Sequence, residues 1–376
     1  MNIRRYLMDQ MPYMLKSGKV LLLLGSRRVG KTFLLKEIAE SFTGKVLMLN
    51  AEDAGHRRLL EDNTISNYRR LLQNVSLLII DEAQTIPGIG KILKLMADEV
   101  AGIRILVTGS SAFDMLNRTG EPLTGRSRMV KMYPVSQKEL SSFQTLPETA
   151  ALLNERLLFG SYPEIFQMAN DEERILYLND IVQHYLLKDI LILDGIRNSS
   201  KMYDLLRTLA WQTGMEVSYH ELANRLGLNK ITVEKYMDLL TKVFVIFKVQ
   251  SFSRNLRKEI VKGHKWYFCD TGIRNALINN FAPIASRSDI GLLWENYWVM
   301  ERIKYNAAEN KLFNYYFWRT YDQQEIDFIE EKDGKLQAYE IKWKDSKAKV
   351  PKVFAESYPD HSFHLITRNN YLDYIS

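Results

Sequence analysis

One short segment, residues 25–32, constrains the fold of this chain more than any other. It reads Gly-Ser-Arg-Arg-Val-Gly-Lys-Thr and lies between an apolar run at 20–24 and a stretch of helical apolar spacing at 31–42. A strand, a glycine loop and a helix in this order form a phosphate-binding loop. Gly25 and Gly30 permit backbone conformations and close approaches that a Cβ would block. The loop N–H groups and the helix N-terminus then point at phosphate oxygens, so we expect a nucleoside triphosphate to bind here.

The polar side chains of the loop have expected roles. Lys31 places a cation on the β- and γ-phosphates, and Thr32 offers its hydroxyl to Mg²⁺. Arg27 and Arg28 are candidates for phosphate contact or for docking a partner. The alternative, a glycine turn with a chance lysine, is disfavoured because the motif and its context agree. The residues expected at the nucleotide are Gly25, Ser26, Arg27, Arg28, Val29, Gly30, Lys31, Thr32 and Phe33.

Composition sets broad limits on the class of protein. The chain has 376 residues and one cysteine, Cys269, which excludes an internal disulfide framework and agrees with a reducing cytoplasm. No apolar run is long enough to span a membrane, so we expect a cytoplasmic protein with no membrane partner. The net charge of +6 favours a polyanionic partner without identifying one.

The first region, residues 1–136, alternates apolar runs with helical patterns. This alternation predicts an α/β fold with a parallel sheet flanked by helices. The expected strands are 20–24, 46–50, 77–81 and 103–108, and the expected helices are 31–42, 67–73 and 91–100. Helical patterns dominate residues 137–198, most clearly at 152–159 and 173–194, which predicts a helical lid or linker.

The apolar run at 77–81 ends in two carboxylates, Asp81 and Glu82. Next to a phosphate loop, Asp81 is expected to hold Mg²⁺, directly or through water. Glu82 is then expected to orient and deprotonate the attacking water as the general base. Adjacent carboxylates at the end of a buried strand are costly unless a cation or a water network compensates them. The alternative is an acidic surface turn.

Four further residues are candidates for the hydrolytic site. Thr108 and Ser110 follow the next strand and could sense the γ-phosphate or the lytic water, although an ordinary turn explains them nearly as well. Arg126 or Arg128 could act as a finger that stabilises transition-state charge, in cis or from a neighbouring subunit. A finger supplied in trans would make hydrolysis depend on a homo-oligomer.

Residues 217–240 have a helix-turn-helix pattern. A capped apolar helix ends at Gly227, and a second apolar helix begins after Asn229. Apolar stretches at 243–251 and 266–268 could form a wing. The positive charge between and beside them, which includes Lys262, His264 and Lys265, could contact DNA phosphates. The alternative is a packing or protein-interaction module with a solvated charged edge.

The C-terminal region, residues 286–376, places two acids and a lysine where a hairpin would bring them together. Strand alternation puts Glu340 and Lys342 on one face, and Asp327 can reach the same place from the neighbouring strand. Glu295 or Glu301, on a preceding helix, could complete the set. Two carboxylates holding Mg²⁺ beside a lysine form a constellation for phosphodiester cleavage. The alternative is an amphipathic hairpin with a cross-strand salt bridge.

These motifs together resemble a family of prokaryotic AAA-type ATPases. In that family a phosphate-loop domain precedes a winged helix and a C-terminal PD-(D/E)XK, restriction-endonuclease-like domain. The resemblance is carried by Gly25-Ser26-Arg27-Arg28-Val29-Gly30-Lys31-Thr32, Ile80-Asp81-Glu82-Ala83-Gln84, Gly109-Ser110-Ser111, Leu123-Thr124-Gly125-Arg126, Gly160-Ser161-Tyr162-Pro163-Glu164, Tyr267-Phe268-Cys269-Asp270-Thr271-Gly272, Glu295-Asn296 and Glu325-Ile326-Asp327. It implies ATP as the nucleotide and leaves the nuclease activity open, because Ile326-Asp327 replaces Pro-Asp.

The expected architecture is therefore a P-loop NTPase core at 1–136, a helical lid at 137–198, a winged-helix module at 199–285 and a nuclease-like domain at 286–376. The expected function is Mg²⁺-dependent ATP binding, with hydrolysis that drives or gates movement of DNA- or protein-binding modules. The alternatives are a slow, nucleotide-gated binding switch and an ATP-regulated nuclease. The sequence leaves open the pathway, the partner, the oligomeric state and the choice between Arg126 and Arg128.

Overall fold

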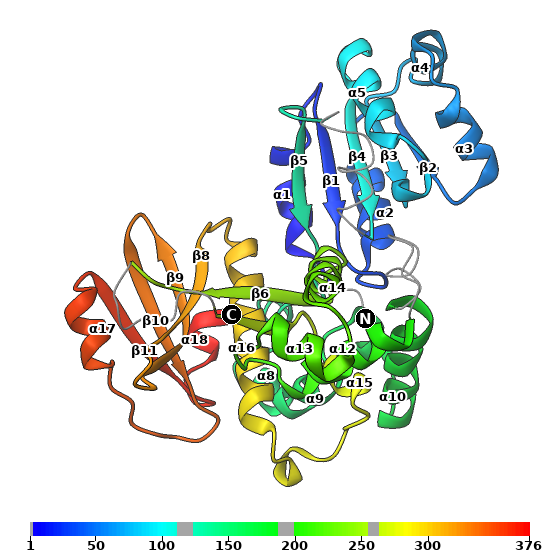
Figure 1. The fold of residues 1–376 in the computed structure, drawn as a ribbon. Coiled ribbons are helices and arrows are strands. Elements are labelled where there is room, and N and C mark those ends of the chain that lie inside the picture. The colour runs from blue at the N-terminus through cyan, green and yellow to red at the C-terminus, as the bar shows by residue number, and fades with distance from the viewer. Residues whose placement is uncertain (1–2, 111–122, 187–198, 255–262) are drawn as a thin grey trace.

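The computed structural model describes residues 3–110, 123–186, 199–254 and 263–376. Figure 1 shows a first sheet with its helices in one lobe, a helical region beside it, and a second sheet in the other lobe. Among the described residues, no helix combines the length and apolar character needed to cross a membrane.

The first sheet is parallel and five-stranded, in the order β2-β3-β4-β1-β5. Its strands are β1 (Val20–Leu24), β2 (Val46–Asn50), β3 (Leu77–Asp81), β4 (Arg104–Gly109) and β5 (Ser127–Lys131). The four strands expected from the sequence are confirmed, with β4 displaced by one residue. Such a parallel sheet places the carboxyl ends of neighbouring strands at one edge, where ligands bind in open α/β sheets.

Helices cover both faces of this sheet. They are α1 (Tyr6–Met14), α2 (Lys31–Ser41), α3 (Ala54–Glu61), α4 (Ile65–Leu71), the short η1 (Ala83–Thr85) and α5 (Ile89–Glu99). Leu21 and Leu23 of β1 belong to a core with residues of α1 and α2, whereas Leu22 belongs to a core with residues of α4 and α5. The alternation of β1 side chains therefore assigns α1 and α2 to one face and α4 and α5 to the other.

A helical region follows the first sheet. Its elements are α7 (Gln137–Leu140), α8 (Leu146–Ala151), α9 (Leu153–Phe159), η2 (Pro163–Gln167), α10 (Asp171–Asp180), η3 (Ile181–Leu186), α12 (Ser199–Trp211), α13 (Tyr219–Leu226), α14 (Lys230–Lys242), α15 (Thr271–Leu277) and η4 (Ile284–Ser286). The helix expected at 152–159 is confirmed as α9. The helix expected at 173–194 corresponds to α10 and η3, and its residues beyond 186 lie outside the described part of the chain.

The two helices expected around Gly227 are α13 and α14. Ser218 caps α13 by accepting a hydrogen bond from the N–H of His220, and Asn229 caps α14 by accepting one from that of Thr232. Gly227 ends α13 with a φ of 63°, a left-handed conformation that glycine adopts without a steric penalty. An antiparallel hairpin, β6 (Ile246–Ser251) and β7 (His264–Phe268), follows them.

The second sheet is mixed and six-stranded, in the order β11-β10-β9-β8-β6-β7. Its other elements are α16 (Ile290–Ala308), β8 (Asn314–Arg319), β9 (Glu325–Lys332), β10 (Lys335–Ile341), α17 (Lys352–Ser357), β11 (His361–Ile366) and α18 (Leu372–Ile375). Gln250 and Ser251 of β6 pair in parallel with Tyr316 and Phe317 of β8. One sheet therefore crosses the expected boundary at residue 285 and joins the third expected domain to the fourth (Figure 1).

Candidate functional site

The phosphate loop joins the carboxyl end of β1 to the first turn of α2. A Cβ on Gly25 would lie 2.2 Å from the carbonyl oxygen of Met132, and backbone cannot move away as a flexible side chain can. Gly30 precedes α2 with a φ of 95°, in the left-handed region. Both glycines are therefore required by close approach or by backbone conformation.

Lys31 and Thr32 begin α2. The Lys31 Nζ donates hydrogen bonds to the carbonyl oxygens of Gly25 and Ser26, at 2.9 and 3.0 Å. The Thr32 hydroxyl donates to Asp81 Oδ2 at 2.7 Å. A threonine hydroxyl and a carboxylate this close together, at a phosphate loop, are oxygen ligands of the kind that Mg²⁺ prefers. The residues present therefore fit the metal that the sequence implies.

Thr108 connects the two acids at the carboxyl end of β3, Asp81 and Glu82. Its hydroxyl donates to Asp81 Oδ1 and accepts the backbone N–H of Glu82 at 3.0 Å. Glu82 has a φ of 53°, a left-handed conformation that costs a non-glycine residue about 1–3 kcal/mol. Gln84 donates to Glu82 Oε2 at 2.5 Å, which orients the carboxylate. Thr108 thus holds a strained turn that places Glu82 beside the loop.

Ser110 directly follows β4 and is buried. Because β4 is the sheet neighbour of β1, Ser110 follows the strand next to the phosphate loop. Its role as a sensor of the γ-phosphate stays a prediction.

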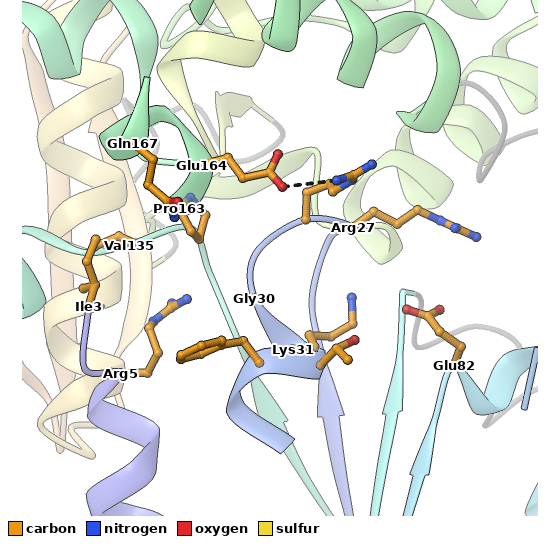
Figure 2. Close-up of a pocket in the computed structure, with 13 residues that line it drawn as sticks. Ile3, Arg5, Arg27, Gly30, Lys31, Glu82, Val135, Pro163, Glu164 and Gln167 are labelled. Carbon is orange, nitrogen blue, oxygen red and sulfur yellow. Dashed lines mark hydrogen bonds and ion pairs between the residues drawn. The ribbon is translucent and has the colours of Figure 1, made fainter. Parts of the chain in front are cut away.

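A pocket of about 780 Å³ lies against the loop. Five of the predicted loop residues and Glu82 line it; the five are Arg27, Arg28, Gly30, Lys31 and Thr32. Phe33, also predicted, lines it as well. Figure 2 shows Lys31 and Glu82 extending into the same space, with the other side of the pocket formed by residues far away in the sequence. These are Ile3, Arg5, Val135, Pro163, Glu164 and Gln167.

Arg5 stabilises the backbone of the phosphate loop. Its guanidinium donates to the carbonyl oxygens of Val29 and Tyr133, both at 2.6 Å, and to Glu139 Oε1 at 2.8 Å. The side chains of Arg5 and Glu139 are almost fully buried. A buried charge needs a charged partner and hydrogen bonds, and Arg5 has both. Val29, which the sequence placed at the nucleotide, is buried and contributes this carbonyl.

The segment around η2 also contacts the loop. The Tyr162 hydroxyl donates to Ser26 Oγ at 3.1 Å, and Arg28 forms a half-exposed ion pair with Glu164 at 3.2 Å. This Gly-Ser-Tyr-Pro-Glu segment, residues 160–164, is one of the motifs that carry the resemblance. The sequence alone does not place the segment at the pocket, because no local pattern shows which distant loop it meets.

The two finger candidates lie away from the pocket. Arg126 precedes β5, at the end of the sheet opposite the loop, and pairs with Asp98 at 2.5 Å. Arg128 is opposite Leu21 in the register, whereas the loop begins after Leu24. Neither lines the pocket beside the phosphate loop, so the structure does not support a role for either in cis. A role in trans stays a prediction.

The structure brings the predicted C-terminal residues together. Lys342 Nζ lies 2.6 Å from Glu340 Oε1 and 3.5 Å from Asp327 Oδ2. The hairpin β9–β10 makes this possible, because its turn residues Asp333 and Gly334 both adopt the positive φ that a tight turn needs. Of the two glutamates proposed to complete the set, Glu295 shares Lys265 with Asp327, whereas Glu301 pairs with Lys304 at 2.7 Å.

A second lysine, Lys265, belongs to this cluster although it lies outside the predicted set of Asp327, Glu340 and Lys342. Lys265 Nζ lies 2.7 Å from Glu325, 3.3 Å from Glu295 and 3.9 Å from Asp327. Burial raises the pKa of Glu295 to about 7, against the opposing effect of Lys265. Burial alone would lower the pKa of Lys265, but these three carboxylates raise it above its usual value. The prediction that Lys265 contacts DNA phosphates is wrong, because the side chain is buried among acids.

The second helix of the predicted helix-turn-helix carries mixed charges. On α14, Lys230 pairs with Glu234 at 3.4 Å and Lys242 pairs with Asp238 at 2.6 Å. These pairs neutralise much of the positive charge that a phosphate backbone would attract. Residues 255–262, which hold much of the predicted wing charge, lie outside the described part of the chain. DNA contact by this module stays a prediction.

Three family matches divide the chain. Residues 17–141 match the family described as an AAA domain, residues 150–283 match a domain of unknown function (DUF8612), and residues 290–373 match a domain of unknown function (DUF4143). An uncharacterized protein of Mycobacterium tuberculosis is 29% identical over 87% of this chain and 71% of its own length. One of Methanocaldococcus jannaschii is 24% identical over 93% of this chain and 84% of its own length.

Two solved structures are similar at low sequence identity. A Walker-type ATPase of Pyrococcus abyssi has a TM-score of 0.49 and 15% identity, covering 73% of this chain and 93% of that one. A signal transduction ATPase with numerous domains, from Pyrococcus horikoshii, has a TM-score of 0.30 and 13% identity, covering 82% and 47%. The AAA match, the loop and the parallel sheet together support assignment of the first region to the P-loop ATPases.

Proposed function

We propose that this protein binds Mg²⁺–ATP at the loop of residues 25–32, hydrolyses it, and uses the nucleotide state to drive or gate movement of its C-terminal modules. One observation carries the proposal. Thr32, Asp81, Thr108 and Glu82 form a continuous hydrogen-bonded chain beside the loop lysine. That chain gathers metal ligands and a base next to a phosphate site, which is the arrangement that phosphoryl transfer to water requires.

The chain's own residues have distinct tasks in this proposal. Lys31 exchanges its two loop carbonyl partners for phosphate oxygens. Thr32 and Asp81 hold Mg²⁺, which neutralises charge on the phosphates when bound. Glu82, fixed by Gln84 and by its backbone bond to Thr108, accepts the proton of the attacking water. Ser110 is proposed as a sensor on the neighbouring strand.

Two hydrogen-bonded connections support transmission from the loop to the C-terminal half. The first runs from Val29 through Arg5 and Glu139 to α7, where the N–H of Gln137 donates to Glu301 of α16 at 2.6 Å.

The second connection starts at Ser26 and Arg28, which contact Tyr162 and Glu164. The N–H of the adjacent Ser161 donates to Asp270 at 2.7 Å, just after β7. The residues proposed to bind phosphate are thus linked to α16 and to the segment directly after β7.

A turnover assay tests the proposed chemistry. Phosphate release is measured for the wild-type protein and for Glu82→Gln, with Glu61→Gln on the exposed end of α3 as the matched control. We expect Glu82→Gln to lose about 10²–10⁴-fold in turnover while it still binds nucleotide, as removal of a general base does. Unchanged turnover in Glu82→Gln refutes the base assignment, and no affinity of either protein for Mg²⁺–nucleotide refutes the site itself.

The same assay distinguishes the motor from the slow switch and identifies the partner. Turnover is measured alone, with single- and double-stranded DNA, and over a range of protein concentrations. Stimulation by DNA that falls steeply with salt supports a DNA-coupled motor, since phosphate contacts release counterions. Slow turnover that no nucleic acid changes supports a nucleotide-gated switch with a protein partner. A rise in specific activity with protein concentration supports an arginine supplied by a neighbouring subunit.

A further inference from the structure

The acidic cluster of the second sheet has an ammonium group at its centre. Lys265 comes from β7, outside the Glu-x-Lys motif, and its Nζ lies within 3.9 Å of carboxylates on α16 and at two positions of β9. Only 4% of the side chain is exposed. A cation so deeply buried is stable only when opposite charges surround it, so the cluster and the lysine require each other.

The carboxylates of the predicted metal site already have partners. Asp327 Oδ2 accepts the N–H of Ile341 at 2.8 Å and faces Lys342, while Oδ1 faces Lys265. Glu340 Oε1 contacts Lys342.

The remaining acid of the set is engaged in the same way. Glu295 Oε1 accepts the Tyr267 hydroxyl at 2.7 Å and the Lys265 ammonium at 3.3 Å. Within the described ranges, no group of three or more His, Cys, Asp or Glu residues is arranged to hold a metal ion. The residues present therefore do not fit the divalent ion that a nuclease-like fold implies.

The position of Lys265 is fixed by its surroundings. Its Nζ lies 5.5 Å from the centre of the Phe317 ring, and its backbone is paired with Val249 of β6. A Cβ on Gly214 would lie 3.1 Å from Glu295 Oε1, so the backbone closes tightly over the acid. The strand pairing, the Phe317 ring and the closely approaching backbone therefore all place the ammonium group among the acids.

We infer that Lys265 is the resident cation of this cluster: its ammonium takes the place of a divalent metal and fastens β7 and α16 to β9. The second sheet then connects the predicted winged-helix region to the C-terminal region. It does not bind the ion that metal-dependent phosphodiester cleavage needs. The inference stands apart from the proposed ATPase, because it concerns residues that do not touch the nucleotide pocket.

Mn²⁺ binding, measured by electron paramagnetic resonance, tests the inference without any activity assay. All proteins carry Thr32→Ala and contain no nucleotide, so the phosphate-loop metal does not contribute. We expect no bound Mn²⁺ that depends on Asp327, so that adding Asp327→Asn changes nothing. Lys265→Met, which keeps the side-chain length but removes the charge, should gain a bound Mn²⁺ per chain that Asp327→Asn removes. Lys335→Met, on an exposed position of β10, is the control and should gain none.

Two results overturn the inference. One is Mn²⁺ binding that Asp327→Asn abolishes in the protein with Lys265 intact. The other is a folded Lys265→Met protein that gains no ion. If Lys265→Met does not fold, the first comparison still decides, because it uses the native lysine. Plasmid cleavage with Mg²⁺ or Mn²⁺ adds an independent readout: cleavage by the wild-type protein that Lys342→Ala abolishes would also overturn it.

Discussion

The buried pair of Arg5 and Glu139 should behave as one energetic unit. The two side chains are 4% and 2% exposed and meet at 2.8 Å. Removing one partner of such a pair leaves the other charge buried, which costs about 3–5 kcal/mol. Glu139→Gln leaves Arg5 its two carbonyl acceptors, and Arg5→Met leaves Glu139 the N–H and hydroxyl of Ser136. We therefore expect each single variant near the lower value, about 3 kcal/mol.

The double variant should cost far less than the sum of the two. Once both charges are absent, neither is left unpaired, so we expect a total of about 4 kcal/mol and a coupling energy of about 2 kcal/mol. With a urea dependence of about 3 kcal/mol/M, each single variant lowers the unfolding midpoint by about 1 M. Arg4→Met, at the exposed pair of Arg4 and Asp9, is the control and should change stability by less than about 0.5 kcal/mol.

Urea unfolding is followed by two probes. Circular dichroism reports the whole chain, whereas tryptophan fluorescence reports only the later part, because all six tryptophans lie at residue 211 or beyond. The midpoint of the first transition seen by dichroism is compared among the wild type, the two single variants and the double variant, with Arg4→Met as the control. A loss of unfolding free energy in the double variant that equals the sum of the two single losses within about 0.5 kcal/mol would refute the reasoning. Such additivity is expected of independent sites and not of a buried ion pair.

Three other perturbations have definite expected outcomes. Gly160→Ala and Gly125→Ala share a φ of 72°, but a Cβ at Gly160 would lie 2.0 Å from Asp270 Oδ1, while one at Gly125 meets nothing within 4 Å. Thermal unfolding should therefore show a cost of about 1 kcal/mol for Gly125→Ala and a much larger one for Gly160→Ala, and equal costs would contradict the close approach. The raised pKa of Glu295, about 7 against an ordinary 4.5, means that the folded state holds a proton that the unfolded state releases. Stability from this group should fall between about pH 4.5 and about pH 7, and Glu295→Gln should remove that fall from the pH dependence of unfolding; an unchanged profile would argue against it. Thr32→Ala should make nucleotide affinity, measured by fluorescence titration, nearly the same with Mg²⁺ and with EDTA, whereas Ser41→Ala at the exposed end of α2 should keep the difference.

Local signals were enough to predict the first sheet and its phosphate loop. The apolar runs that became β1 and β3 are short, continuous and buried along their whole length, as internal parallel strands are. The run that became β2 has the same apolar pattern, although this strand lies at the sheet edge and is mostly half-buried. The loop motif specifies backbone geometry within eight residues, so no distant contact was needed to recognise it. Asp81 and Glu82 followed from their place at the end of such a strand.

Residues whose role depends on distant partners could not be predicted in this way. Arg5 reaches Glu139 across a separation of 134 residues, and nothing in its local sequence distinguishes it from a surface arginine. From its local sequence, Lys265 resembled one more positive charge of a basic wing. In the structure β7 belongs to the second sheet, where the Lys265 side chain lies among three carboxylates. Arg126 and Arg128 were plausible by type, but the register of β5 against β1 places them away from the loop.

The parallel pairing of β6 with β8 has a consequence for how this protein can be divided. A fragment that starts at residue 286 would lack β6 and β7, leaving one side of β8 as an unpaired edge and three acids without Lys265. Exposed edges invite aggregation, and unpaired buried charges destabilise the fold. The boundary between the two family matches, at 283–290, is therefore not a place where the chain can be cut into two stable fragments.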